Sequence, residues 1–303
     1  LEVEIYPGFA AAEVLFDDDG TVVGVATGDM GVGADGQPKD GHERGLELRA
    51  RYTVFAEGCR GHLGKQLIAR FGLDALADPQ HYGIGIKELW EIEPDRHSQG
   101  LVVHTTGWPL PSDTGGGSFL YHMEDNQVVV GLIVDLNYSN PHLIPFDEFQ
   151  RIKHHPALKR FLEGGRRVSY GARAITKGGL NALPKMVMPG AIIVGCNAGT
   201  LNFSKIKGTH TAMKSGMVAA ETLADALQGD GAGETLDDYT ERFRTSWAWE
   251  ELNVARNFGP AMHRFGLWGG AAFNFLDQNI FRGRLPLTLH DTTRDHETLK
   301  PAS

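Results

Sequence analysis

Alternation of apolar and polar residues predicts β structure over the first 56 positions. The predicted strands cover residues 1–5, 12–16, 21–26 and 46–55. The turn Asp17-Asp18-Asp19-Gly20 joins two of them as a hairpin, because Asp and Gly adopt the turn conformations that a hairpin needs. The polar, glycine-rich stretch 31–45 is predicted to be a loop. A small-residue turn at 56–61 then leads to a predicted helix over 62–71.

A second strand-rich region lies between residues 80 and 140. Its predicted strands cover residues 82–89, 101–106, 118–123 and 128–136. The glycine run 115–117 lies between two of these strands. A helical piece over 145–162 and a strand over 167–173 are predicted to follow. The glycine run either forms an ordinary hairpin loop or lets a flat ligand approach bare backbone.

The stretch 188–227 has the pattern of a cofactor site. The β-branched run at 192–194 predicts a buried strand, which leads directly into the small-residue loop 195–199. Gly208-Thr209 then opens a helix. Its predicted apolar face consists of Met213, Met217, Ala220, Leu223, Ala224 and Leu227. A strand, a glycine loop and a helix N-terminus together present backbone N–H groups to an anion or an electron-rich ring.

The last third of the chain is predicted to be helical and rich in aromatic residues. One amphipathic helix is predicted over 237–256, and an apolar segment follows over 261–281. This segment has no charge between Arg264 and Asp277, a window shorter than the roughly 20 apolar residues of a membrane span. It is either an interfacial helix that dips into a bilayer or a buried core helix. The polar tail from Asp291 is expected to be a linker.

Composition narrows the function classes. The 303 residues are 41% hydrophobic, which is enough for one large core or two domains. The formal charge of −9 and the lack of a Lys/Arg run argue against a nucleic-acid partner. The two cysteines are too few for a disulfide framework or a cysteine-bound cluster. Because the chain starts inside a strand pattern without Met, we expect a piece of a longer protein.

Two short motifs resemble a phosphate loop and a metal site, but neither meets the requirements of that site. A phosphate loop at 56–65 would need Gly at position 59 and Ser or Thr at position 66, where Cys and Gln stand. The turn could still hold a dinucleotide pyrophosphate, or it is an ordinary strand-to-helix connection. His154-His155 does not predict a metal site, since neighbouring side chains on a helix point apart. No metal site is predicted from the sequence.

Seven segments together resemble the electron transfer flavoprotein–ubiquinone oxidoreductase family. They are PGFAAAEVLFDDDG, HERGLELRARYTVFAEGCRGHLGKQL, YGIGIKELWEI, GGSFLYHM, EFQRIKHHPALKRFLEGG, YGARAI and KIKGTHTAMKSGMVAAE. The resemblance covers nearly the whole chain, and KIKGTHTAMKSG and GGSFLYH are its most specific parts.

The resemblance implies a mixed α/β fold. A Rossmann-like FAD-binding half would carry an inserted antiparallel β-sheet domain for quinone, as in the glutathione-reductase-like flavoproteins. The implied domains are residues 1–75 and 176–258 for FAD, 76–175 for ubiquinone and 259–290 for a membrane-surface helical segment.

The resemblance also implies roles for individual residues. The implied FAD contacts are Gly58, Gly195, Asn197, Ala198, Gly199, Lys207, Gly208 and Thr209. The implied ubiquinone contacts are Gly116 and Gly117. The implied membrane contacts are Phe265, Leu267, Trp268, Phe273 and Phe275. No catalytic side chain is implied, because the cofactor carries the redox chemistry.

Two family features are absent from the sequence. The GxGxxG fingerprint would lie before Leu1, and the four cysteines that bind a four-iron four-sulfur cluster would lie after Ser303. Cys196-Asn197 also stands where the wider superfamily usually has Asp. The chain is therefore expected to be a middle fragment that is inactive alone.

The function implied for the parent protein is electron transfer from reduced electron transfer flavoprotein to ubiquinone. It would act at a bacterial inner membrane on the cytoplasmic face, or at a mitochondrial inner membrane on the matrix face, as a monotopic protein. Two alternatives stay open: an FAD-dependent monooxygenase or geranylgeranyl reductase-like enzyme, and a non-enzymatic membrane-docking fragment.

Overall fold

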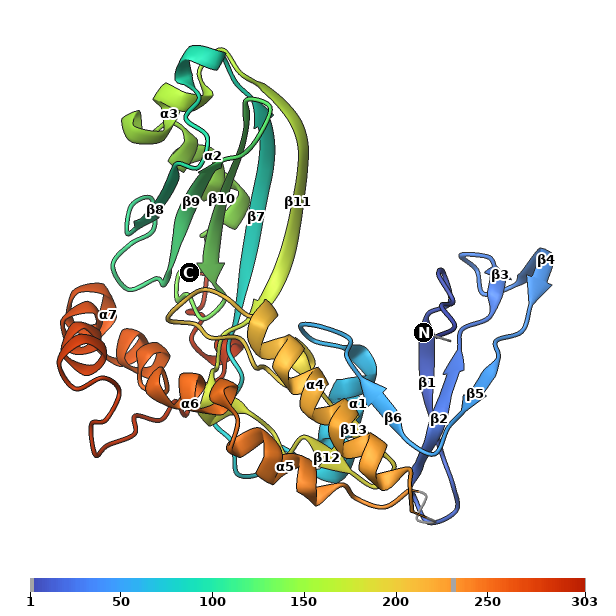
Figure 1. Cartoon of the computed structure of the whole chain (residues 1–303). Coiled ribbons are helices and arrows are strands. Elements are labelled where there is room, and N and C mark those ends of the chain that lie inside the picture. The colour runs from blue at the N-terminus through green and yellow to red at the C-terminus, as the bar shows by residue number, and fades with distance from the viewer. Residues whose placement is uncertain (1–2, 230–232, 303) are drawn as a thin grey trace. The chain divides into compact units, whose positions relative to one another are not determined.

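The computed structural model describes residues 3–229 and 233–302 and divides the chain into two compact units (Figure 1). Unit 1 contains the described residues of Leu1–Leu76, Leu183–Thr200 and Gly208–Glu250. Unit 2 contains those of Ala77–Ala182, Leu201–Lys207 and Glu251–Ser303. The domain boundaries implied by the family resemblance remain a prediction.

The first half of unit 1 is built from short antiparallel strands. Its strands are β1 (Ala11–Phe16), β2 (Val22–Thr27), β3 (Met30–Val32), β4 (Pro38–Glu43) and β5 (Glu47–Arg49). β1, β2 and β5 form one sheet, and β3 pairs with β4. The predicted hairpin turn is present, since the Asp17 carboxylate accepts from the backbone N–H groups of Asp19 and Thr21 at 3.1 and 2.8 Å.

Three sequence predictions in this region are wrong. Residues 3–5 of the predicted first strand are not a strand, and positions 1 and 2 lie outside the described residues. The predicted loop 31–45 contains β4 and most of β3, because a tight turn centred on Ala34-Asp35, closed by the Gly36 N–H bonding to the Gly33 carbonyl, lets the two arms pair. The predicted strand 46–55 breaks at 50–52, where the chain leaves β5 for a different sheet.

The second half of unit 1 holds a small parallel pairing and the helices beside it. β6 (Thr53–Phe55) runs parallel to β13 (Ala191–Ile193), and β12 (Val187–Met188) pairs antiparallel to β13. α1 (His62–Phe71) follows β6, and α4 (Thr209–Ala226) follows the loop after β13. Short 3-10 turns lie at η2 (Leu180–Ala182) in unit 2 and η3 (Gly195–Asn197) in unit 1.

The buried face of α4 differs from the predicted one. Met213 and Met217 are 64% and 53% exposed. The buried positions are Thr211, Ser215, Val218, Ala219 and Thr222. Small and hydroxyl-bearing side chains let the helix lie close to its neighbours, and the hydroxyls of Ser215 and Thr222 bond to carbonyls of the preceding turn at 2.7 and 2.8 Å.

The predicted helix 237–256 is two helices. α5 (Asp237–Arg244) ends just before Thr245, and α6 (Trp247–Val254) begins after Ser246. The Ser246 hydroxyl donates to the Phe243 carbonyl at 2.7 Å and accepts from the Trp249 N–H at 3.4 Å. Ser246 thus supplies side-chain hydrogen bonds at the break, a role typical of serine next to helix ends.

Unit 2 is organised around a five-stranded antiparallel sheet in the order β11-β7-β10-β9-β8. Its strands are β7 (Tyr82–Glu91), β8 (Val102–Thr106), β9 (Gly116–His122), β10 (Gln127–Asp135) and β11 (Arg166–Thr176). Figure 1 shows β7 and β11 as long neighbouring strands. η1 (Pro94–Arg96) follows β7, while α2 (Pro145–Lys153) and α3 (Pro156–Leu162) form the predicted helical piece 145–162.

The core of unit 2 lies between the sheet and the helix pair α2–α3. Leu120, Val130 and Leu132 from β9 and β10 are at most 1% exposed and pack in one cluster with Phe149 and Leu158 from the helices. The alternation of buried and half-buried positions along β9 is what an antiparallel sheet with one covered face requires.

The C-terminal part of unit 2 is helical and then extended. α7 (Phe258–Phe275) covers much of the predicted apolar segment but kinks at Gly266, whose φ of 65° and ψ of −171° are not helical. A π-helical turn, η4 (Leu276–Ile280), and a 3-10 turn, η5 (Asp295–Glu297), follow.

The tail from Asp291 is not the linker that the sequence predicted, because it is tied back to the start of β7. The Asp295 carboxylate accepts from the Tyr82 N–H at 2.9 Å.

A buried ion pair joins the ends of β10 and β11. Asp135 and Lys177 contact each other through Oδ2 and Nζ, with side chains 2% and 0% exposed. The Lys177 Nζ also lies 4.3 Å from the centroid of the Phe203 ring, and the Lys177 N–H donates to the His81 carbonyl at 2.9 Å. A charge this deeply buried is tolerated because its partner is present.

Replacement of Asp135 by Ala is expected to destabilise unit 2 by about 3–5 kcal/mol, since it leaves the Lys177 charge buried without its carboxylate. The midpoint of urea unfolding, followed by tryptophan fluorescence, measures the change. Asp113→Ala, at an exposed loop position, serves as the control and is expected to change stability by less than about 0.5 kcal/mol. The double variant Asp135→Ala/Lys177→Met should recover part of the loss. Additive losses would contradict a coupled pair.

Candidate functional site

The carboxyl ends of β6 and β13 lie at the same edge of a sheet in unit 1. The two strands pair in parallel, with Ile193 opposite Phe55. Both then enter turns of small residues, 56–61 after β6 and 195–199 after β13. In open α/β sheets such an edge is where ligands bind, because loops and helix N-termini gather there.

The turn after β6 is held by Glu57. Its carboxylate accepts from the backbone N–H groups of Leu63 and Gly64 at 3.2 and 2.6 Å, so it caps the N-terminus of α1. Asn197, from the other turn, donates to the same carboxylate at 3.4 Å. A Cβ at Gly64 would overlap the Asn197 amide, so glycine at this position allows the two turns to touch.

The turn after β13 is organised around Gly195. Its carbonyl accepts from the N–H groups of Ala198, Gly199 and Thr200 at 3.1, 3.0 and 3.2 Å. Its own N–H donates to the Ser215 hydroxyl of α4 at 2.9 Å. The φ angles of Gly195 and Gly199 are 62° and 97°, which side chains rarely tolerate. The expected FAD contacts 195 and 197–199 therefore form one compact turn beside α4.

The N-terminus of α4 carries two of the expected FAD contacts, Gly208 and Thr209. Gly208, at the N-cap, has no side chain with which to cap the helix, and the first turn has no acidic residue. Thr209 is exposed. The positive end of an 18-residue helix is thus not neutralised by a local carboxylate.

Of the remaining expected FAD contacts, Gly58 is half-buried in the turn after β6, with φ of 79°. Lys207 is exposed and belongs to unit 2, where its backbone pairs with that of Asn202 at 2.9 and 3.2 Å.

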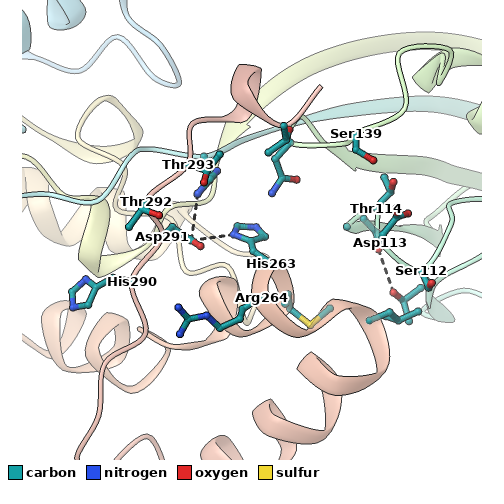
Figure 2. A pocket seen from close by; sticks show the side chains of 18 residues that line it. Ser112, Asp113, Thr114, Ser139, His263, Arg264, His290, Asp291, Thr292 and Thr293 are labelled. Carbon is teal, nitrogen blue, oxygen red and sulfur yellow. Dashed lines mark hydrogen bonds and ion pairs between the residues drawn. The ribbon is translucent and has the colours of Figure 1, made fainter. Parts of the chain in front are cut away.

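Unit 2 contains a cavity of about 430 Å³ (Figure 2). It is bordered by the loop before β9, the first half of α7 and the tail after Leu289. Gly116 and Leu267, expected to contact quinone and membrane respectively, both line it, together with polar side chains such as Thr114 and Ser139. A volume of this size falls within the range of small-molecule sites.

The glycine run beside the cavity is required by packing as well. A Cβ at Gly115 would overlap the Asp135 carboxylate, and one at Gly116 would overlap the Ile133 carbonyl. A Cβ at Gly117 would overlap the Thr105 carbonyl. Gly116 and Gly117 begin β9, so the run is neither a hairpin loop nor free backbone on both faces. Gly116 lines the cavity and Gly117 is not among its lining residues.

Two histidines and two aspartates meet at one side of the cavity. The Asp291 Oδ2 atom lies 3.0 Å from His263 Nδ1 and 3.3 Å from His81 Nε2. The other nitrogen of His81, Nδ1, lies 2.6 Å from Asp295 Oδ1. Figure 2 shows the His263 ring directed toward Asp291.

These contacts set the ionisation of the group. Burial lowers the pKa of the His81 imidazole, but the carboxylates of Asp291 and Asp295 outweigh this effect and raise the pKa to about 9. Burial raises the pKa of the Asp291 carboxyl, but its contacts with the His263 and His81 imidazoles hold it well below its usual range.

The sequence did not reveal this group because its members are far apart. His81 and Asp295 are separated by 214 positions, and no motif spacing connects them. The sequence holds only a weak indication of this group: polar residues flank both the strand that begins at 82 and the apolar segment that begins at 261. Only the tertiary structure brings them together.

The other expected membrane contacts lie on or near an apolar surface of α7. Phe265, Trp268 and Phe275 are 45%, 79% and 61% exposed, and Phe273 is half-buried against Phe265 with ring centroids 5.8 Å apart. Leu276, Ile280 and Phe281, which lie in η4 or directly after it, are also exposed. We call these seven residues the α7 apolar surface. Among the described residues, no helix is long and apolar enough to cross a bilayer.

Comparison with known proteins identifies relatives over the whole chain. Residues 82–175 match the family model described as "ETF-QO, ubiquinone-binding". The chain is 64% identical to the electron transfer flavoprotein-ubiquinone oxidoreductase of Pseudomonas aeruginosa, over 100% of this chain and 55% of the relative. It is 51% identical to the mitochondrial human protein of the same name, over 100% of this chain and 50% of the relative.

Several solved structures share the fold. A geranylgeranyl bacteriochlorophyll reductase-like protein from Thermoplasma acidophilum matches 88% of this chain and 60% of its own, with a TM-score of 0.62 and 17% identity. The predicted mixed α/β fold with antiparallel sheets is thereby confirmed. The chain spans about half the length of the curated relatives that it matches. The resemblance read from the sequence is confirmed: along its entire length, this chain is similar to a section of the electron transfer flavoprotein–ubiquinone oxidoreductases.

Proposed function

We propose that this chain is the flavin- and quinone-contacting section of an oxidoreductase that passes electrons from reduced electron transfer flavoprotein to ubiquinone at a membrane. The observation that carries the proposal is the cavity in unit 2, bordered by Gly116 and Leu267. The five-stranded sheet of unit 2, β7 to β11, spans nearly the same residues as the match to the ubiquinone-binding family model, 82–175.

The residues of unit 1 fit an FAD ring system. The α4 N-terminus is preceded by a glycine N-cap and has no acidic residue in its first turn, so no local carboxylate competes with an electron-rich ligand. The turn at 195–199 exposes no large side chain that would block its approach. Within the proposal, Gly58, Gly195, Asn197, Ala198, Gly199, Gly208 and Thr209 would hold the cofactor, in the glutathione-reductase-like arrangement. The role of Lys207, which belongs to unit 2, stays a prediction from the family resemblance.

A bound FAD would supply the storage of electrons between donor and acceptor. The contribution of this chain to that chemistry would be electrostatic. Amide groups and the dipole at the first turn of α4 would stabilise negative charge added to a ring bound there. Glu57 keeps the neighbouring turn in place through α1 and is itself occupied by two backbone N–H groups.

The residues of unit 2 fit a quinone head group. Gly116 places backbone without a side chain at the cavity wall, where a carbonyl oxygen could approach. Leu267 contributes an apolar wall from α7, the helix that also carries the α7 apolar surface. We propose that this surface rests in one leaflet and that the protein is monotopic, since interfacial helices bury aromatic side chains at the headgroup level.

The remaining parts of the proposal concern the intact protein. A four-iron four-sulfur cluster would be held by residues outside this chain, as the family resemblance implies. The membrane would be a bacterial inner membrane, on its cytoplasmic face, or the mitochondrial inner membrane, on its matrix face.

Replacement of Thr209 by Asp tests the flavin site in the intact protein. A carboxylate at the first position of α4 favours the helix itself, so the fold is expected to persist. It opposes added electrons on the ring, so the flavin reduction potential should fall by on the order of tens of millivolts. Spectroelectrochemical titration measures the shift.

Met217→Asp is the matched control for this experiment. It adds the same charge at an exposed position of α4 beyond the first turn, where the dipole effect has faded. Equal shifts in both variants, or no shift in either, would show that the α4 N-terminus does not face the flavin.

Replacement of Leu267 by Trp tests the quinone site. A larger side chain fills part of the cavity, so reoxidation of the reduced flavin by a ubiquinone analogue should slow at least about tenfold, whereas reduction by the flavoprotein donor should not. Stopped-flow absorbance separates the two half-reactions. If NADPH, rather than the flavoprotein, reduces the flavin at a useful rate, the protein is a hydroxylase or prenyl reductase.

Replacement of both Phe265 and Trp268 by Ser tests membrane contact. Each buried aromatic contributes about 1.5–3 kcal/mol, so liposome binding should weaken more than about 100-fold in a sedimentation assay. The control is Leu76→Ser, which removes a fully exposed leucine of unit 1 at 103% relative exposure. Unchanged binding of the double variant would rule out this surface as the membrane contact.

A further inference from the structure

We propose that His81, His263 and Asp291 form a binding site for a divalent transition metal ion of the Zn²⁺ class. One nitrogen of each histidine and one oxygen of Asp291 lie within 4.8 Å of one another. The three residues come from the segment before β7, from α7 and from the tail after Leu289. The proposal concerns unit 2 alone and does not depend on the proposed function.

Two of the three separations between donor atoms suit a tetrahedral ion. With metal–ligand distances of about 2.0–2.1 Å, neighbouring ligands of a tetrahedral site lie about 3.3 Å apart. The Asp291 Oδ2 atom is 3.3 Å from His81 Nε2 and 3.0 Å from His263 Nδ1. The third separation, between the two histidine nitrogens, is within 4.8 Å, and a movement of His263 that brings it to a similar length would admit the ion.

The His81 Nε2 atom is buried beside Asp291 without a hydrogen bond to any described residue. The His81 side chain is only 4% exposed, and its Nε2 atom has no hydrogen-bond partner among the described residues. Although Asp291 lies at 3.3 Å, the contact does not have the direction of a hydrogen bond. Buried polar nitrogens without hydrogen bonds are uncommon, and an ion is one of the groups that completes them.

Asp295 orients His81 as a second ligand shell would. Its Oδ1 atom lies 2.6 Å from His81 Nδ1 and its Oδ2 atom accepts from the Tyr82 N–H. Metal-binding histidines typically place their other nitrogen against a carboxylate, which fixes the ring and leaves the first nitrogen for the metal. The same arrangement is found here on the buried histidine.

The donor set selects the kind of ion. Two imidazoles and one carboxylate suit Zn²⁺ and its transition-metal neighbours, whereas Ca²⁺ and Mg²⁺ prefer oxygen ligands. Two carboxylates, Asp291 and Asp295, would balance a double positive charge. Such an ion would join three segments that are distant in sequence at one wall of the cavity.

The experiment is a titration of the intact protein, stripped with a chelator, with Zn²⁺ by isothermal calorimetry. One site per chain with micromolar or tighter affinity is expected, together with a rise in melting temperature on loading and no comparable binding of Mg²⁺. Asp291→Asn, nearly isosteric, and His263→Ala, on α7, should each weaken binding more than about 100-fold. Asp295→Asn should weaken it about 10- to 100-fold.

His97→Ala is the matched control. His97 and His122 form another histidine pair in unit 2, with ring centroids 5.2 Å apart. Binding should be unchanged in this variant, and circular dichroism checks that every variant is folded. The absence of Zn²⁺ binding, or binding that survives both Asp291→Asn and His263→Ala, overturns the proposal. In that case a proton, rather than a metal, holds the group together.

Discussion

A buried pair of opposite charges organises the part of unit 2 from which both of its candidate sites are built. Asp135 ends β10 and Lys177 follows β11, and neither side chain is more than 2% exposed. Removal of these charges from water costs free energy that their mutual contact offsets. The pair therefore constrains what surrounds it. Gly115 has no side chain because the Asp135 carboxylate occupies that space.

The same pair reaches the histidine group through the backbone. The Lys177 N–H bonds to the His81 carbonyl, and the His81 ring then meets Asp291 and Asp295 from the tail. A continuous chain of contacts thus runs beside the cavity. It consists of the glycine run 115–117, the ion pair of Asp135 and Lys177, and the group around His81. This continuity explains why the polar tail, which has little apolar surface of its own, is held against the sheet.

Among the described residues of unit 1, the candidate site is held by backbone hydrogen bonds and not by a buried ion pair. Its turns after β6 and β13 contain few side chains that could pack, so they are held by backbone groups: Glu57 caps α1 and the Gly195 carbonyl collects three N–H groups. Small residues on the buried face of α4 then allow close approach. An arrangement stabilised in this way leaves the N-terminus of α4 uncapped, which is the property that an electron-rich ring requires.

The local features of this chain were determined by its sequence. Apolar runs and turn residues predicted most strands of the five-stranded sheet, α1, the start of α4 and the turns around 57 and 195, because these depend on neighbours a few positions away. Tertiary contacts decided the rest. Met213 and Met217 are exposed because the turn at Gly195 packs against the small side of α4 instead. Strand 46–55 divides because its two halves find partners in different sheets. The group of His81, His263 and Asp291 exists only in three dimensions, since no local pattern can indicate that residues from three separate segments will share one carboxylate oxygen.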